Sequence, residues 1–275
     1  MTREPRKVWG GSLHTPFRLL PQPLGHLKPF LQADGKTPQD VLKALPYESR
    51  RSKAAAKLPD AKRYRDARQV YEVAGLLYEG DDGLIHLTDL GCATFRWIDM
   101  LTPKNVVVLG RHAAYALSAC QLRTPIGVQP YDESVVVFPF AFIWRAMLAL
   151  GNKISSDELN RAIFKVTNEG ELDQAIGNIS QARAKSDLSI MGEETVTGDK
   201  KNDRIIPWIS IASFGWTLIW DKRTGEESGY YRIPEHTSGL IREAAAIRHR
   251  HCEFKSTGEY VEHIARAAAL PKDLR

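Results

Sequence analysis

The feature that most constrains the fold is the segment 77–87, in which two short apolar runs flank a turn of glycine and aspartate. Glycine and aspartate tolerate the backbone angles of a tight turn, so this pattern predicts a β-hairpin. The preceding stretch, about residues 60–77, carries Tyr64, Val70 and Tyr71 at helical spacing. Residues 88–100 begin with Thr-Asp-Leu-Gly and have the pattern of a further helix. We therefore predict helix, hairpin and helix in succession.

The remaining elements are mostly helical. Thr37 and Pro38 have the residue types of a helix start, predicting a short helix up to residue 45. Further helices are expected at 24–33, 111–120, 139–150, 155–166, 170–184 and 234–247. Residues 215–220 and 230–233 form strand patterns around a long polar turn, which predicts a second, looser hairpin followed by a helix.

The predicted fold class is mainly α with short β-hairpins, arranged as two units joined by a helical linker. The expected division is an N-terminal arm at 1–23, a first unit at 24–102, the linker at 103–133 and a second unit at 134–275. At 275 residues the chain is long enough for two ordinary domains.

Charge is concentrated in one part of the chain. Residues 43–68 contain nine Lys or Arg against three Asp or Glu, a surplus of six, whereas the whole chain has a net charge of +5. A local cationic surplus of this kind is typical of proteins that bind polyanions. The predicted helix at 60–77 therefore has an apolar side and a cationic, amide-bearing side.

Such a helix is suited to the DNA major groove, where Arg pairs with guanine and Gln with adenine. The candidate base-contacting residues are Arg63, Arg65, Arg68 and Gln69. The candidate phosphate-contacting residues are Arg50, Arg51, Lys53, Lys57 and Lys62. In the second unit the candidates are Lys200, Lys201, Arg204, Lys222 and Arg223. The alternative interpretation of both groups is an ordinary solvated surface, and nearby acids dilute the second group.

The strings Gly-Leu-Leu at 75–77 and Leu-Thr-Asp-Leu-Gly at 87–91 resemble the winged-helix superfamily of bacterial DNA-binding proteins. The resemblance covers about 65 residues. It implies a helix-turn-helix with a β-wing in the first unit. Tandem winged helices are similar to the DNA-recognition modules of restriction and phage-defence proteins.

A search for catalytic patterns finds no phosphate-binding glycine loop, dinucleotide fold motif or nucleophile elbow. No cofactor or metal is therefore expected, and the chain is predicted more as a binding protein than an enzyme. His249-Arg250-His251-Cys252 has no matching ligand pair elsewhere. Glu253-Phe254-Lys255 resembles the end of a metal-dependent nuclease motif, but it follows a predicted helix and lacks an upstream acid on a strand.

These observations predict double-stranded DNA binding, with a recognition role in a restriction or anti-phage defence system and possible action beside a nuclease or helicase partner. A homodimeric transcription repressor, a replication initiator, a metal-dependent endonuclease and a protein-interaction adaptor stay open. Sparse cysteines, together with the lack of a signal peptide pattern or an apolar run long enough to span a membrane, predict a cytoplasmic, nucleoid-associated protein.

Overall fold

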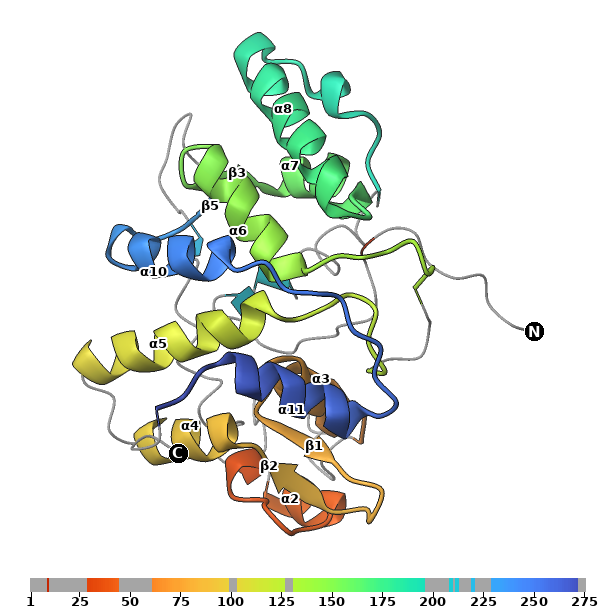
Figure 1. The fold of residues 1–275 in the computed structure, drawn as a ribbon, viewed down its shortest axis with the longest axis vertical. Coiled ribbons are helices and arrows are strands. Elements are labelled where there is room, and N and C mark those ends of the chain that lie inside the picture. Colours follow the sequence, from red (N-terminus) through yellow and green to blue (C-terminus); the bar gives the residue numbers. More distant parts are fainter. Residues whose placement is uncertain are drawn as a thin grey trace, which may run out of the picture.

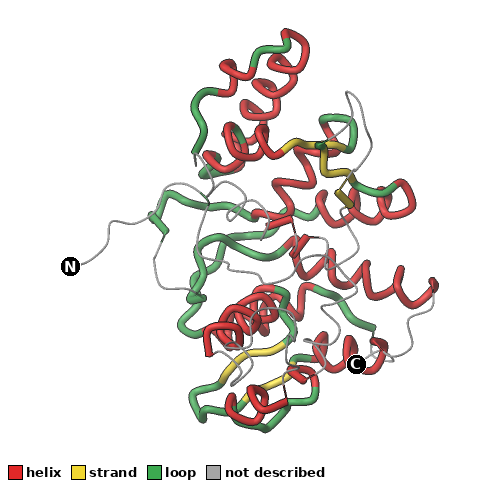
Figure 2. The backbone as a smooth tube through the Cα atoms, turned by 180° about the vertical axis from the view of Figure 1, so that it is seen from behind, coloured by secondary structure: helices red, strands yellow, loops and turns green. Residues whose placement is uncertain are grey.

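We describe a computed structural model of the chain. The described residues are 9, 29–44, 61–98, 103–126, 131–195, 208–209, 211–212, 219–220 and 229–271. The architecture is mainly helical with two small antiparallel sheets, as the sequence predicts. The sheets lie in opposite halves of an elongated molecule, with helices between them (Figure 2). No helix among the described residues is long and apolar enough to cross a membrane.

The first unit lies at one end of the molecule (Figure 1). Its elements are α2 (Pro38–Ala44), α3 (Ala61–Val73), β1 (Leu77–Glu79), β2 (Ile85–Leu87) and α4 (Asp89–Ile98). The predicted hairpin is confirmed: β1 and β2 are antiparallel, with Leu77 opposite Leu87. The segment 33–36 extends this sheet along the other edge of β2, because the N–H of Ile85 donates to the carbonyl of Lys36 at 2.9 Å and the N–H of Gly35 donates to that of Ile85 at 2.8 Å.

The second unit also has two helices, a hairpin and a helix in this order, with a further helix and strand before them and two 3₁₀ turns between them. It comprises α6 (Pro139–Ala149), β3 (Lys153–Ser155), α7 (Ser156–Arg161), the 3₁₀ turn η1 (Ile163–Lys165), α8 (Glu169–Lys185), the 3₁₀ turn η2 (Leu188–Met191), β4 (Ile219–Trp220), β5 (Tyr230–Arg232) and α10 (Glu235–Ala246). Its sheet has the order β3-β5-β4. In the second unit β3 precedes two helices and pairs with β5, the returning strand of the hairpin. In the first unit the turn segment 33–36 takes the corresponding position beside β2, through two backbone hydrogen bonds to Ile85.

Local sequence signals explain several helix starts. The hydroxyl of Thr37 donates to Asp40 at 2.7 Å at the start of α2. Ser155 and Glu158 form a reciprocal capping box at the start of α7. The Leu-Thr-Asp-Leu-Gly string has a packing role, since Thr88 donates its hydroxyl to the carbonyl of Gly75 at 2.6 Å and Gly91 lies against the carbonyl of Leu76. A side chain at position 91 has no room, so this glycine allows α4 to pack on the turn after α3.

The helix expected to link the units is α5 (Pro103–Ser118). It is more than a connector, because it packs against α4 and α11 on one side and α6 and α10 on the other. In Figure 1 it crosses the middle of the molecule.

A residue from near the start of the chain packs in the second unit, and a helix from near its end packs on the first unit. Trp9, expected in an extended arm, is fully buried in the second unit, where its ring stacks on Phe164 and its indole N–H donates to the carbonyl of Val166 at 2.6 Å. The last helix, α11 (Thr257–Ala267), packs on α3, β1 and α4 of the first unit (Figure 1). Trp9 therefore contributes to the core around η1, and α11 covers the first unit.

Candidate nucleic-acid interface

Helix α3 is the basic helix of the sequence, and aromatic contacts hold its inner side. The ring of Phe30 stacks on Tyr64 with 5.5 Å between centroids and meets Tyr71 edge-on at 4.9 Å. Val70 and Ala74 complete the buried side toward the end of the helix. Burial of this side fixes the rotation of α3 about its axis.

Arg68 joins α3 to the hairpin. Its guanidinium forms ion pairs with Glu72 on the same helix, at 3.2 Å from Nε to Oε1, and with Glu79 on β1. The same group lies over the ring of Tyr64, 5.7 Å from its centroid. Arg68 therefore uses its charge within the protein and fixes the geometry between the helix and the hairpin.

Two neighbouring groups have strongly shifted pKa values. Burial raises the pKa of Glu72 to about 7, against the opposing effect of the Arg68 guanidinium, and the Glu79 carboxylate adds to the rise. Burial also raises the pKa of Tyr64 to about 12. Glu72 is buried, so the network below the outer side of α3 contains a carboxyl group that titrates near neutral pH.

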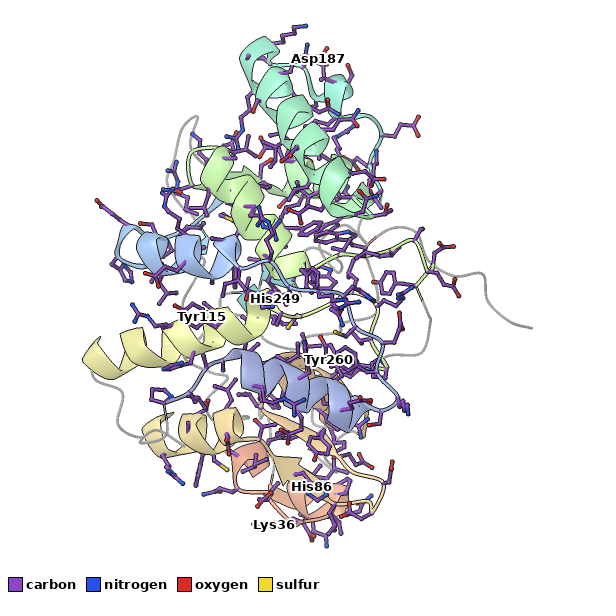
Figure 3. The ribbon with its side chains drawn as sticks, in the orientation of Figure 1. Lys36, His86, Tyr115, Asp187, His249 and Tyr260 are labelled. Carbon is purple, nitrogen blue, oxygen red and sulfur yellow. The ribbon has the colours of Figure 1, made fainter. Side chains whose placement is uncertain are left out.

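The hairpin turn is closed by its own side chains. Asp82 accepts from the N–H of Leu84 at 3.0 Å, and its two carboxylate oxygens each lie 3.0 Å from Nε2 of His86. The His86 ring stacks on Tyr78, with 5.3 Å between centroids. These contacts close the hairpin tip, which carries two carboxylates, Asp81 and Asp82. Figure 3 shows His86 and Lys36 near this end of the molecule.

The structure places the predicted DNA-contacting residues as follows. Lys62, Arg63 and Arg65 lie in the first two turns of α3, and Gln69 is a half-buried residue of the third turn. Arg68 lies between them on the same helix but is engaged by Glu72 and Glu79. The other candidates fall outside the described residues: Arg50, Arg51, Lys53, Lys57, Lys200, Lys201, Arg204, Lys222 and Arg223.

In the second unit, α8 occupies the place in the succession that α3 has in the first. Its first turns carry Glu169, Glu171 and Asp173, so its start is acidic where that of α3 is basic. Near its end, Arg183 forms an ion pair with the buried Glu158 of α7, at 2.7 Å from Nε to Oε1. Sequence reasoning missed Arg183. The spacing of capping-box residues was visible in the sequence, but a contact between α7 and α8 has no local signal.

Arg183 also holds the second sheet against these helices. It donates to the carbonyls of Leu150 and Lys153 at 2.7 and 2.9 Å. Two cations lie over the ring of Tyr230 on β5: the Arg183 guanidinium is 5.4 Å from the ring centroid and the Lys153 ammonium is 5.0 Å from it. The cation at the end of α8 is therefore used for internal structure, as Arg68 is on α3.

The string Glu253-Phe254-Lys255, which resembles the end of a nuclease motif, does not lie on a strand. Glu253 lies in the irregular segment between α10 and α11, is exposed, and forms an ion pair with Arg123. Across the part of the chain that the structure describes, no three His, Cys, Asp or Glu residues are grouped so that they could hold a metal ion. His249, also in this segment, has its Nε2 atom 2.8 Å from the Ser118 hydroxyl, and burial lowers its pKa to about 4.

Among comparisons with known proteins, only the comparison of structures gives a match. No protein-family model matches the sequence, and no curated protein matches it either. The fold is similar to a solved structure described as the BpuJ1 endonuclease binding domain in complex with pyrene- and phenanthrene-modified DNA. The TM-score is 0.58 over 95% of this chain and 97% of that chain, with 10% sequence identity. At this identity the similarity is one of fold, and it extends over almost the whole length of both chains.

Proposed function

We propose that this protein binds double-stranded DNA through its first unit, with α3 as the recognition helix. The observation that carries the proposal is the position of three cations from the basic stretch 43–68. Lys62, Arg63 and Arg65 occupy the start of α3, the helix that leads directly into the hairpin. Side chains of this kind can neutralise phosphates and contact guanine edges in the major groove.

Within this proposal both units are winged helices. The succession of two helices, hairpin and helix in each unit supports this interpretation, and so does the early segment beside the returning strand, which is β3 in the second unit and the turn segment 33–36 in the first. The described similarity to a DNA-complexed binding domain supports it independently, because it covers both units.

The internal ion pairs refine the roles of the predicted residues. Since Arg68 is paired with Glu72 and Glu79, we assign it a positioning role and leave base contacts to Arg63, Arg65 and Gln69. The basic residues at 50–57 remain candidates for phosphate contacts. Those at 200–204 and 222–223 remain weaker candidates in the second unit.

The biological setting we propose is sequence or structure recognition in a bacterial restriction or defence system, in the cytoplasm and associated with the nucleoid. The binding domain to which the fold is similar comes from an endonuclease, which supports this setting. A nuclease or helicase that acts on the bound DNA would then be a partner of this chain or a further part of the same system.

The test is a DNA-binding titration at several salt concentrations, comparing the parent with Lys62→Ala/Arg63→Ala/Arg65→Ala. Each lost phosphate contact flattens the slope of log affinity against log salt by about one unit. The matched control is Lys185→Ala/Arg242→Ala/Arg250→Ala, which removes three exposed cations elsewhere and the same net charge.

We expect the α3 variant to lose affinity and salt dependence, and the control to retain most of both. Equal losses in the two variants would show a general charge effect and would contradict α3 as the recognition helix. A parent protein without measurable DNA affinity at low salt would contradict DNA binding altogether and would favour the protein-interaction alternative.

A further inference from the structure

The first hairpin is packed against the C-terminal helix. β1 and α11 are in contact, and the ring of Tyr78 lies so close to Gly258 that a β-carbon at that position would be 2.8 Å from Cε2. The absence of a side chain at Gly258 therefore allows the first turn of α11 to approach the hairpin. The Tyr78 ring also stacks on His86.

A second close approach lies at the other end of the hairpin, where β1 leaves α3. Gly75 has a positive φ of 75°, and a β-carbon there would lie 2.8 Å from Cγ2 of Ile264. The buried residues of α11 are Tyr260, Val261, Ile264 and Ala265, and among them Ile264 and Ala265 lie against Gly75. The hairpin thus packs against α11 through β1 and is hydrogen-bonded to the segment 33–36 through β2, so both of its strands are engaged within the protein.

The charge of the hairpin is opposite to that of α3. Residues 77–89 contain four Asp or Glu and no Lys or Arg, whereas residues 61–69 contain four Lys or Arg and one Asp. Asp81 and Asp82 at the tip are exposed, and so is Asp34 beside β2, with Lys36 as the nearby cation. His86, the other basic group of the hairpin, is held by Asp82. A surface with this charge repels DNA phosphates.

From this geometry we propose that the first hairpin is a docking platform for α11 and lies off the DNA, so that the first unit contacts DNA through α3 without a wing contact. The inference rests on the proposed DNA binding and specifies its orientation. In this orientation the phosphates of bound DNA contact α3, and the acidic hairpin tip makes no contact with them.

The test adds one lysine at each surface, in Gln69→Lys on α3 and Asp81→Lys at the hairpin tip. Both variants are titrated with a DNA duplex between low salt and about 0.15 M, where charges more than about 8 Å apart are largely screened. We expect Gln69→Lys to raise the affinity and steepen the salt slope by about one unit. Asp81→Lys should leave the slope unchanged and the affinity at the highest salt within about twofold of the parent, because a screened charge adds no contact.

The outcomes separate the two claims. If Asp81→Lys steepens the slope as Gln69→Lys does, the hairpin contacts DNA and the inference is overturned while DNA binding stands. If neither variant changes the slope, α3 is not the contact surface and both the orientation and the proposed site fail. Absence of DNA affinity in the parent refutes the proposed function itself.

The docking role is tested separately by urea unfolding of Gly258→Ala in two backgrounds. Alanine normally stabilises a helix relative to glycine, so in the Tyr78→Ala background, where the ring is gone, Gly258→Ala should raise the urea midpoint. In the parent background the same substitution should lower the midpoint or leave it unchanged, because the new methyl group meets the Tyr78 ring. Equal shifts in the two backgrounds would show that Tyr78 and α11 are not in contact, and would overturn the docking platform.

Discussion

Replacing Glu72 by glutamine tests the network beneath α3. Glu72 is buried and carries a pKa raised to about 7, because burial disfavours its charged form more than Arg68 favours it. Glutamine keeps nearly the same shape and removes the titration. The variant therefore isolates the part of the stability that depends on the protonation of this one carboxyl group.

The sign follows from proton linkage. A rise from the ordinary value of 4.5 to about 7 means that the folded protein holds this proton over a pH range in which the unfolded chain has lost it. The free energy of unfolding of the parent therefore falls as the pH rises from about 4.5 to about 7, and this contribution is constant above and below that range. At about 1.4 kcal/mol per pKa unit, the total loss is about 3 kcal/mol.

The assay is urea unfolding of the parent and of Glu72→Gln at several pH values from 4 to 8. Between pH 4.5 and 7 we expect the parent to lose about 3 kcal/mol of unfolding free energy relative to Glu72→Gln. Above pH 7 the difference between the two proteins should stay constant. Curves that stay parallel, or that diverge in the opposite direction, would show that the pair with Arg68 outweighs burial and would refute the reasoning.

Three further predictions concern packing and buried charge. Gly91→Ala should lower the unfolding free energy by at least about 2 kcal/mol, because its methyl group meets the carbonyl of Leu76. The control Gly177→Ala on α8 places its methyl group in open space and should stabilise the protein slightly. Glu158→Ala should cost about 3 to 5 kcal/mol in urea unfolding because it leaves the guanidinium of Arg183 without its buried partner. His249, whose pKa is lowered to about 4, should make the parent lose stability as the pH falls from 6.5 toward 4, and His249→Gln should remove this loss in thermal unfolding scans.

The elements with local signals could be predicted from the sequence. The hairpin at β1 and β2 follows from its turn residues, and α7 follows from its capping pattern at Ser155 and Glu158. The repeated hairpin is also confirmed, since β4 pairs with β5 across a long connection. In each case the residues that determine the element are neighbours in the chain, so their pattern is visible without the fold.

Contacts between distant segments could not be predicted in this way. The strand β3 is three residues long and pairs with β5 about 75 positions later. Arg68 has the sequence context of an exposed cation on a basic helix, and only the fold brings Glu79 beside it. The burial of Trp9 likewise depends on Phe142, Phe164 and Trp208, which lie more than 130 residues away.

Contacts made by Trp9 and by α11 connect the two units in a way that the local sequence patterns do not predict. Trp9 fills the core of the second unit, while α11 covers α3 and β1 of the first. α5 lies between the units and is tied to the segment near α11, since Ser118 contacts His249 and Gln121 exchanges two hydrogen bonds with the backbone of Cys252. Neither unit therefore has a complete core from a continuous stretch of chain. If α3 binds DNA as proposed, α8 is held at a set position relative to the same duplex, and its acidic first turns would disfavour close phosphate contact there.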